Sequence, residues 1–238
     1  MSPQRIQRMK PYYADESVTL YHGDCLTVTE WLAADVLVTD PPYGTNRLGE
    51  NPKGGYGRRQ NAAGNSRHAS VRNVGVEGFT IANDEDTSVR DAALALWGTR
   101  PALVFGSPRM PDPPGEWADR LVWDKQRPGM NGGPFRYTHE AIYARGMVRA
   151  NNSTFSVIAA FPDQADHIHA KPLKLMRALV MTAPPGVIAD PFAGSGSTLV
   201  AAKQLGRRAI GVELEERYCE VAARRLSQGV LDFGGEAS

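Results

Sequence analysis

The sequence predicts an α/β fold with a doubly wound, mainly parallel sheet and one antiparallel hairpin. Mainly apolar runs typical of buried strands alternate along the 238 residues with segments of helical character, and this alternation favours parallel strands covered on both faces. A strand near the C-terminus runs through a Gly-Ser-Gly turn into a helix, as in nucleotide-binding βαβ units. Because 42% of the residues are hydrophobic, the chain can bury a sizeable core, and we expect one domain spanning residues 1–238.

The expected elements follow from hydrophobic periodicity and from helix-start signals. The expected strands are 17–21, 36–39, 102–106, 121–124, 140–143, 187–190 and 209–213. The segments 121–124 and 140–143 form the expected hairpin. Helices are expected over 26–32, 84–97, 172–181 and 215–226, and a further helix opens at 199–202. Acidic residues at 84–86 favour a helix N-terminus, and Pro172 suits a first helical turn.

The strand at 36–39 leads into a rigid turn, Asp40-Pro41-Pro42-Tyr43. The two prolines fix φ and remove both backbone donors. The turn therefore offers a carboxylate and carbonyl oxygens as acceptors, with a Tyr ring beside them. This set suits a planar nucleobase that carries an amino group. By itself, an ordinary proline turn at a strand end would explain the pattern equally well.

A second motif lies at 187–198, where a strand ending at Asp190 meets the Gly194-Ser195-Gly196 turn. Glycines there allow a ligand to approach the backbone closely, and the following helix N-terminus favours polar or anionic groups. The next strand ends at Glu213, which is placed to accept hydrogen bonds from ribose hydroxyls. A dehydrogenase fingerprint would carry a third glycine where this chain has Leu199, so a nucleotide-dependent oxidoreductase is disfavoured.

Together the two motifs resemble the DNA amino-methyltransferases that modify adenine N6 or cytosine N4. The catalytic motif precedes the cofactor motif, as in the permuted β class of that family. The resemblance implies a Rossmann-like, S-adenosylmethionine-dependent methyltransferase fold. One departure, Gly-Ser-Gly-Ser-Thr where the family more often has Gly-Ser-Gly-Thr-Thr, keeps a hydroxyl. Further segments in the family's order are 137–143, Lys171-Pro172-x-x-Leu175, 190–192, 205–213 and 224–226.

The resemblance makes the double-proline turn catalytic, through Asp40, Pro41, Pro42 and Tyr43. An aromatic amine is a poor nucleophile because its lone pair is delocalised into the ring. The Asp40 carboxylate and the Pro41 carbonyl would hold both N–H bonds out of the ring plane and localise that lone pair. The base must be flipped out of the duplex, and Tyr43 would stack on it.

The resemblance also assigns a cofactor site for S-adenosylmethionine. Glu213 would bind the ribose, and Asp190 with the backbone of the glycine turn would meet the methionine end. Asp24 resembles the acid that accepts from the adenine amine, although a helix N-cap is nearly as good an explanation. The expected cofactor residues are Asp24, Lys171, Asp190, Phe192, Gly194, Ser195, Gly196, Ser197, Thr198 and Glu213.

The expected partner is double-stranded DNA, and the net charge of only +1 requires a local basic patch to bind it. Residues 45–76 carry six basic residues against one acid, and we expect them to form a mobile loop that contacts phosphates. The interval 146–166 is too short for a separate recognition domain, so specificity falls to this loop or to a second subunit, within a possible homodimer. The six basic residues are Arg47, Lys53, Arg58, Arg59, Arg67 and Arg72.

Adenine N6 is the preferred target because Asp begins the catalytic turn, whereas Ser is commoner in the cytosine N4 enzymes. Cytosine N4, RNA as substrate, and a non-catalytic DNA-binding subunit stay open as alternatives. Cys25 and Cys219 have no metal-binding spacing, and neither follows a proline as a cytosine C5 nucleophile would. No apolar run reaches membrane length and no signal-peptide core is present, so we expect an intracellular, cytoplasmic protein without a metal.

Overall fold

The computed structural model describes residues 9–43, 86–108, 110–126, 138–149, 152–158 and 170–228. The described strands form one sheet in the order β1-β2-β9-β8-β3-β4-β6-β5-β7. The strands are β1 Tyr13–Ala14, β2 Val18–His22, β3 Val36–Thr39, β4 Ala102–Gly106, β5 Asp119–Asp124, β6 His139–Arg145, β7 Thr154–Ser156, β8 Ile188–Asp190 and β9 Ala209–Glu213.

The central five strands, β2, β9, β8, β3 and β4, run parallel to one another. At one end of the sheet β6 runs antiparallel to both β4 and β5, and Leu121 pairs with Ile142 in this hairpin. The predicted α/β fold with a mainly parallel sheet and one antiparallel hairpin is therefore confirmed. The short β1 and β7 are additions that the sequence did not predict, because two or three residues give no readable periodicity.

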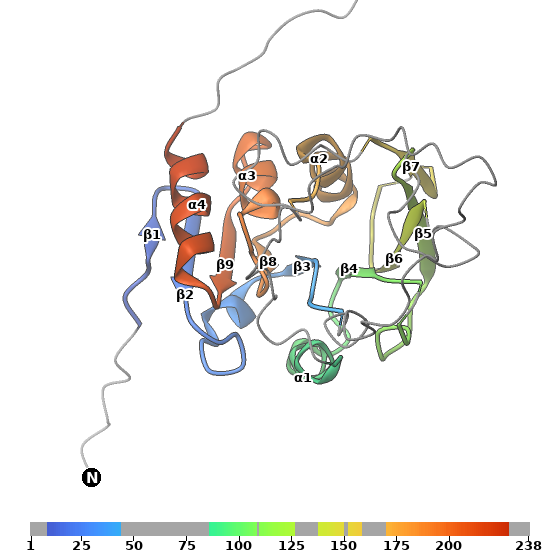
Figure 1. The fold of residues 1–238 in the computed structure, drawn as a ribbon, viewed down its shortest axis with the longest axis horizontal. Coiled ribbons are helices and arrows are strands. Elements are labelled where there is room, and N and C mark those ends of the chain that lie inside the picture. Colours follow the sequence, from blue (N-terminus) through green and yellow to red (C-terminus); the bar gives the residue numbers. More distant parts are fainter. Residues whose placement is uncertain are drawn as a thin grey trace, which may run out of the picture.

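Helices cover both faces of the sheet, as Figure 1 shows. One face carries α2 Leu173–Thr182, α3 Ser197–Gln204 and α4 Glu216–Ser227, while α1 Ser88–Trp97 and the 3₁₀ helix η1 Glu30–Ala33 lie on the other. Alternate side chains of β3 pack against the helices on opposite faces of the sheet. Val36 and Val38 pack in the cluster formed with α2, α3 and α4, whereas Leu37 packs in the cluster that contains Trp31 and Trp97.

The prediction of a helix over 26–32 is wrong, because the structure has tight turns there, followed by the single 3₁₀ turn η1. The Asp24 carboxylate accepts the Leu26 N–H at 2.9 Å, and the Asp24 carbonyl accepts the Val28 N–H at 2.8 Å. The Trp31 indole then donates to the Cys25 carbonyl at 2.9 Å. A carboxylate that competes for backbone donors favours turns over a regular helix.

In α1, the Asp86 carboxylate accepts the Ser88 N–H at 2.8 Å, so the helix begins at Ser88.

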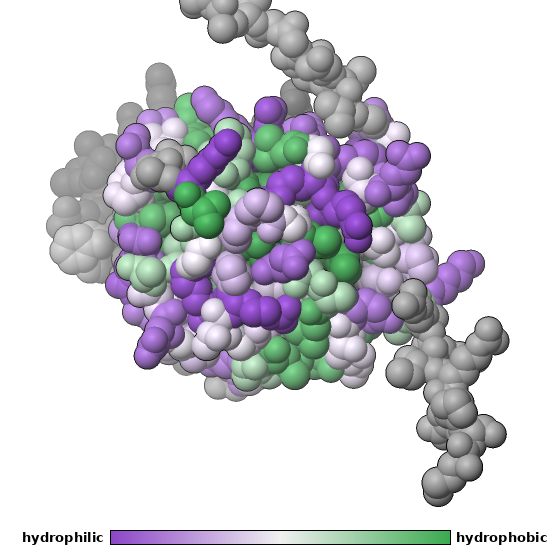
Figure 2. All heavy atoms as spheres, turned by 180° about the vertical axis from the view of Figure 1, so that it is seen from behind, coloured by the Kyte–Doolittle hydropathy of each residue, from purple (hydrophilic) through white to green (hydrophobic). Residues whose placement is uncertain are grey.

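Exposed large apolar side chains are scattered over several elements, and Figure 2 shows hydrophilic and hydrophobic residues interspersed on the face turned away in Figure 1. Within the described ranges, no helix combines the length and apolar character needed to cross a membrane.

Burial predicts that replacing two different leucines by alanine will change the free energy of unfolding by very different amounts. Leu37 is 1% exposed in the middle of β3, whereas Leu96 on α1 is 47% exposed. Leu37→Ala should lower the free energy of unfolding by about 2–5 kcal/mol, because a cavity remains between sheet and helices. Leu96→Ala should change it by less than about 0.5 kcal/mol. Urea denaturation of both variants tests this, and equal midpoints would contradict the packing described here.

Candidate functional site

Acidic residues gather at the carboxyl edge of four adjacent parallel strands. Glu213 and Asp190 end β9 and β8, Asp40 follows β3, and Asp24 lies two positions beyond β2. The chain leaves β8 through α3 toward β9, but leaves β3 through α1 toward β4, so the winding reverses between β8 and β3. Ligands of doubly wound sheets bind outside such a switch point. The fold therefore marks the edge that bears Asp190 and Asp40 as the candidate site.

The turn after β8 depends on a carboxylate and on one glycine. The Glu213 Oε2 accepts the Gly194 N–H at 2.7 Å, and Oε1 accepts the Glu215 N–H at 2.8 Å. Gly196 is left-handed with φ of 79°, and a Cβ there would lie 2.9 Å from the Ala222 Cβ. A side chain at this position would strain the turn against α4. Each carboxylate oxygen of Glu213 keeps a lone pair for a further donor, such as a hydroxyl.

Arg225 on α4 donates hydrogen bonds to the same turn. Its Nη1 donates to the Ser195 carbonyl at 2.6 Å, to the Ser195 Oγ at 3.0 Å and to the Ser197 Oγ at 3.3 Å. Sequence analysis assigned no role to Arg225, because its partners Ser195 and Ser197 lie about 30 positions earlier in the chain. Both serines therefore face a cation within the protein, and the turn backbone is fixed by a side chain outside the motif.

Asp190 is 2% exposed and connects the two halves of the site. Its Oδ1 accepts the Thr39 hydroxyl at 2.7 Å and the Phe192 N–H at 3.2 Å. Burial raises the pKa of Asp190 to about 6, although hydrogen bonds from Thr198 and Thr39 oppose the shift. Phe192 packs against the buried cluster beneath α1 and η1, where it supports the strand end.

The catalytic turn predicted at 40–43 holds a carboxylate with partners on both oxygens. The Tyr43 hydroxyl donates to Asp40 Oδ1, and the Lys171 ammonium donates to Oδ2. Pro41 is buried and Pro42 half-buried. Burial raises the pKa of Asp40, Lys171 opposes this, and Glu140 adds to it. Burial would lower the pKa of Lys171, but the carboxylates of Asp40 and Glu140 outweigh it and raise that pKa.

Lys171 thus lies against the catalytic turn, whereas the resemblance expected it beside the cofactor. Glu140 on β6 was missed altogether as a site residue, because only the pairing of β6 with β4 brings the hairpin to this edge. A charged residue inside an otherwise apolar strand, as in Glu140-Ala141-Ile142-Tyr143, was the available signal. Asp24 uses one carboxylate oxygen for the Leu26 N–H in a turn, and because no helix begins there, Asp24 is not the helix N-cap of the alternative explanation.

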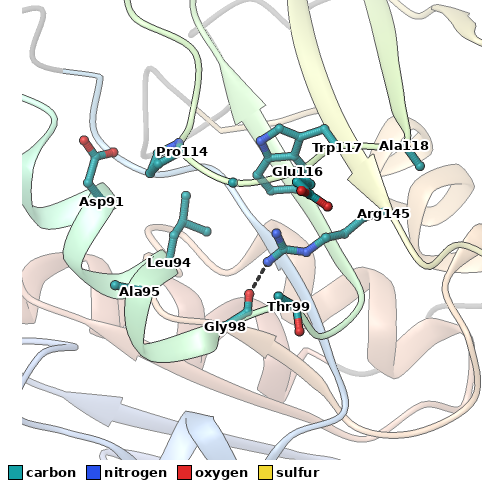
Figure 3. Close-up of a pocket in the computed structure, with 11 residues that line it drawn as sticks. Asp91, Leu94, Ala95, Gly98, Thr99, Pro114, Glu116, Trp117, Ala118 and Arg145 are labelled. Atoms are coloured by element: carbon teal, nitrogen blue, oxygen red, sulfur yellow. Dashed lines mark hydrogen bonds between the residues drawn. The ribbon is translucent and has the colours of Figure 1, made fainter.

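A separate hollow of about 970 Å³ lies between α1 and the segment before β5 (Figure 3). Arg145 reaches from the end of β6 to the Gly98 carbonyl and stacks 4.6 Å from the centre of the Trp117 ring. Ala102, the first residue of β4, pairs with Arg145, so this hollow belongs to the amino edge of β4. It faces away from the edge that bears the acidic residues.

The expected DNA-contacting residues Arg47, Lys53, Arg58, Arg59, Arg67 and Arg72, with the loop 45–76, lie outside the described residues. Among the described residues, no group of three or more His, Cys, Asp or Glu side chains could hold a metal ion. Both cysteines are buried and free.

Known proteins resemble this chain in sequence and in fold. The N6/N4 DNA methylase family matches residues 148–224. Type II methyltransferase M2.LlaDCHI of Lactococcus lactis subsp. cremoris is 25% identical over 258 residues, which cover 92% of this chain and 93% of that protein. In sequence, the chain is therefore similar to DNA amino-methyltransferases.

Two solved methyltransferases share the fold. The M1.HpyAVI–SAM complex has a TM-score of 0.54 at 21% identity and covers 87% of this chain and 99% of that one. The cytosine-N4-specific PvuII DNA methyltransferase has a TM-score of 0.53 at 14% identity, over 95% of this chain and 91% of that one. The carboxyl edge described above is the candidate active site.

The buried carboxyl of Asp190 predicts a specific pH dependence of stability. Its pKa in the folded state, about 6, is above the ordinary value of 3.8. The folded protein therefore binds this proton more tightly than the unfolded chain, and Asp190 stabilises the fold more as pH falls from about 7.5 to about 5. The wild-type free energy of unfolding should rise by about 1 kcal/mol relative to that of Asp190→Asn over this range.

Urea denaturation of the wild type and of Asp190→Asn at both pH values measures this difference. Because the comparison is between two proteins at each pH, contributions from carboxyl groups that do not interact with Asp190 cancel. A difference that stays constant with pH would show that the Asp190 pKa is unshifted.

Proposed function

We propose that this chain transfers the methyl group of S-adenosylmethionine to the exocyclic N6 amine of adenine in double-stranded DNA. The observation that carries the proposal is the placement of the Asp40 carboxylate beside Asp190, on the two sides of the switch point. One side offers acceptors for an amine and the other a turn suited to a nucleoside ligand. The sequence match to DNA methylases and the fold shared with a SAM complex support the same conclusion.

The residues on the β8–β9 side fit S-adenosylmethionine. Gly196 has no Cβ, which would clash with Ala222 in this turn. The Glu213 carboxylate keeps acceptor positions that suit ribose hydroxyls. Asp190, once ionised, suits an ammonium group of the methionine end. We propose that Asp24, Phe192, Ser195, Ser197 and Thr198 complete this site. When bound, S-adenosylmethionine supplies an electrophilic methyl group on its sulfonium.

On the β3 side, the protein positions the amine. The Asp40 carboxylate and the Pro41 carbonyl each accept a hydrogen bond from one N–H of the amine. The nitrogen lone pair is then localised and directed toward the methyl carbon. The nitrogen forms its new bond to that carbon as the bond to sulfur breaks, and it then loses one proton. Positioning and electrostatics supply the rate, with no covalent bond between the protein and the base.

The flipped base costs a few kcal/mol to extract from the duplex. Stacking on the Tyr43 ring offsets roughly 1–3 kcal/mol of that cost. We propose that the basic residues of 45–76 contact the DNA phosphates, which positions the duplex without reading its sequence. We propose that sequence recognition falls to other groups of the same loop or to a second subunit, in a chain that forms a single domain and a homodimer.

Adenine is favoured over cytosine because Asp begins the catalytic turn. The cytosine-N4-specific PvuII enzyme shares the fold at a similar TM-score, so cytosine N4 is the second candidate. A non-catalytic DNA-binding subunit is disfavoured because Asp40, Tyr43 and Glu213 are all retained.

Methyl transfer from labelled S-adenosylmethionine to unmethylated DNA, with the nucleosides separated by mass spectrometry, tests the reaction. N6-methyladenine is the expected product. N4-methylcytosine would keep the mechanism and overturn the target. Cofactor binding without transfer to DNA would favour an RNA substrate or a non-catalytic subunit.

Asp40→Ala should lower the rate of transfer about 100-fold or more, because one acceptor for the amine is lost. Cofactor affinity, measured by calorimetry, should change little. Asp119→Ala is the matched control, since Asp119 is an exposed carboxylate at the start of β5. If Asp40→Ala retains full transfer, the catalytic assignment of the turn is wrong.

Arg225→Met should weaken cofactor binding about tenfold, because Nη1 no longer holds the turn at Ser195 and Ser197. Arg224→Met, one position earlier and exposed, should bind S-adenosylmethionine as the wild type does. Calorimetric titration of both variants measures this. An unchanged affinity in Arg225→Met would remove the turn from the cofactor site.

A further inference from the structure

Four side chains of alternating charge run from the β5–β6 hairpin to the catalytic turn. Lys125 Nζ lies 2.5 Å from Glu140 Oε1, Lys171 Nζ lies 3.2 Å from Glu140 Oε2, and Lys171 also donates to Asp40. These residues come from the end of β5, from β6, from the segment before α2 and from the end of β3. The sequence separates Asp40 from Lys171 by 131 positions, so only the tertiary fold assembles the row.

We propose that Lys171, held by Glu140, is a positioning residue that keeps the Asp40 carboxylate ionised and fixed as an acceptor for the target amine. The inference rests on the proposed function and adds to it a residue that acts through Asp40. Lys171 itself need not touch the base or the cofactor.

The first support is burial. The side chains of Lys171 and Glu140 are 10% and 13% exposed, so neither charge is shared with bulk water. A buried ion pair persists only where geometry and further partners offset desolvation, and here Glu140 contacts two ammonium groups. The charges of the four groups cancel. The arrangement therefore holds one cation against Asp40 without leaving a net charge in the interior.

The second support is an aromatic enclosure around the Lys171 ammonium. The nitrogen lies 4.8 Å from the centre of the Phe105 ring, 5.7 Å from that of Tyr43 and 5.8 Å from that of Trp123. Ring faces attract cations, and they also exclude water. The Trp123 indole donates to the Val157 carbonyl at 2.8 Å and so keeps its place. Lys171 is confined on the side away from the carboxylates.

The third support is the use of the Asp40 oxygens. Tyr43 occupies one lone pair of Oδ1 and Lys171 occupies one of Oδ2. An ionised carboxylate accepts about four hydrogen bonds, so each oxygen keeps a position for an N–H of the amine. Anchored at both oxygens, the carboxylate cannot rotate. Lys171 opposes the rise in the Asp40 pKa that burial causes, and so favours the ionised carboxylate that can accept a hydrogen bond from the amine.

The charged groups around Asp40 determine in which direction its pKa should change when Lys171 is replaced. Glu140 and Asp190 disfavour its ionised form, whereas Lys171 and the hydroxyl of Tyr43 favour it. Lys125 acts at one remove, through Glu140. Removing the Lys171 charge leaves only the Tyr43 hydroxyl to oppose burial and the two carboxylates. The pKa of Asp40 should then rise, and activity should require a higher pH.

The test compares Lys171→Met, Lys171→Arg and the control Lys174→Met, whose lysine is exposed on α2. The acidic limb of the kcat/KM profile for methyl transfer to DNA should move up by about one pH unit or more in Lys171→Met. Lys171→Arg should restore the limb to near its wild-type position, and Lys174→Met should leave it unchanged. A lower rate with an unmoved limb would overturn the proposal, as would a weaker affinity for S-adenosylmethionine as the sole change.

A second measurement keeps this test separate from the proposed function. In protein labelled with ¹³C at the Asp side-chain carboxyl carbons, NMR titration reports the pKa of Asp40, assigned by Asp40→Asn, whether or not DNA is methylated. The pKa should be higher in Lys171→Met than in the wild type. If that variant does not fold, Lys171→Gln replaces it, with the same rise expected in the pKa of Asp40. An unchanged Asp40 pKa in a folded Lys171→Met protein would refute the role of Lys171 even if the wild type methylates DNA.

Discussion

The pairing of β3 with β8 is the contact on which the site depends. It places Thr39 beside Asp190, residues that are 151 positions apart, and joins them by a 2.7 Å hydrogen bond. The winding of the sheet reverses at this pair, so no helix crosses between the two strand ends. The double-proline turn and the glycine turn therefore lie at the same edge of the sheet, each at the end of a fully buried strand.

Buried charge along this edge is balanced by specific partners. Glu213 is bonded by two backbone N–H groups, Asp190 by a hydroxyl and a backbone N–H, and Asp40 by a hydroxyl and an ammonium group. Each carboxylate is thereby oriented before any ligand binds, while each keeps acceptor positions free. Preorganised acceptors of this kind lower the cost of ordering a cofactor and a flipped base.

Sequence reasoning succeeded where a signal is local. The double-proline turn, the Gly-Ser-Gly turn and the acid ending β9 could each be found within about ten residues, and the hairpin was visible from its apolar pattern. It failed at 26–32, where the Asp24 carboxylate turns the chain and no regular helix forms. It also missed Glu140 and Arg225, because an isolated charge in a strand or helix gives no indication of its distant partner.

The sequence by itself determined the α/β class, the strand–turn–helix segments and the chemistry of the two motifs, since these depend on periodicity and on residues adjacent in the chain. Only the tertiary structure decided which side chains complete the site. Strand order brings Lys171 and Glu140 to Asp40, and helix packing brings Arg225 beneath Ser195. The physical reason is that side-chain contacts across a sheet depend on which strands become neighbours, and that order is fixed by packing of the whole core.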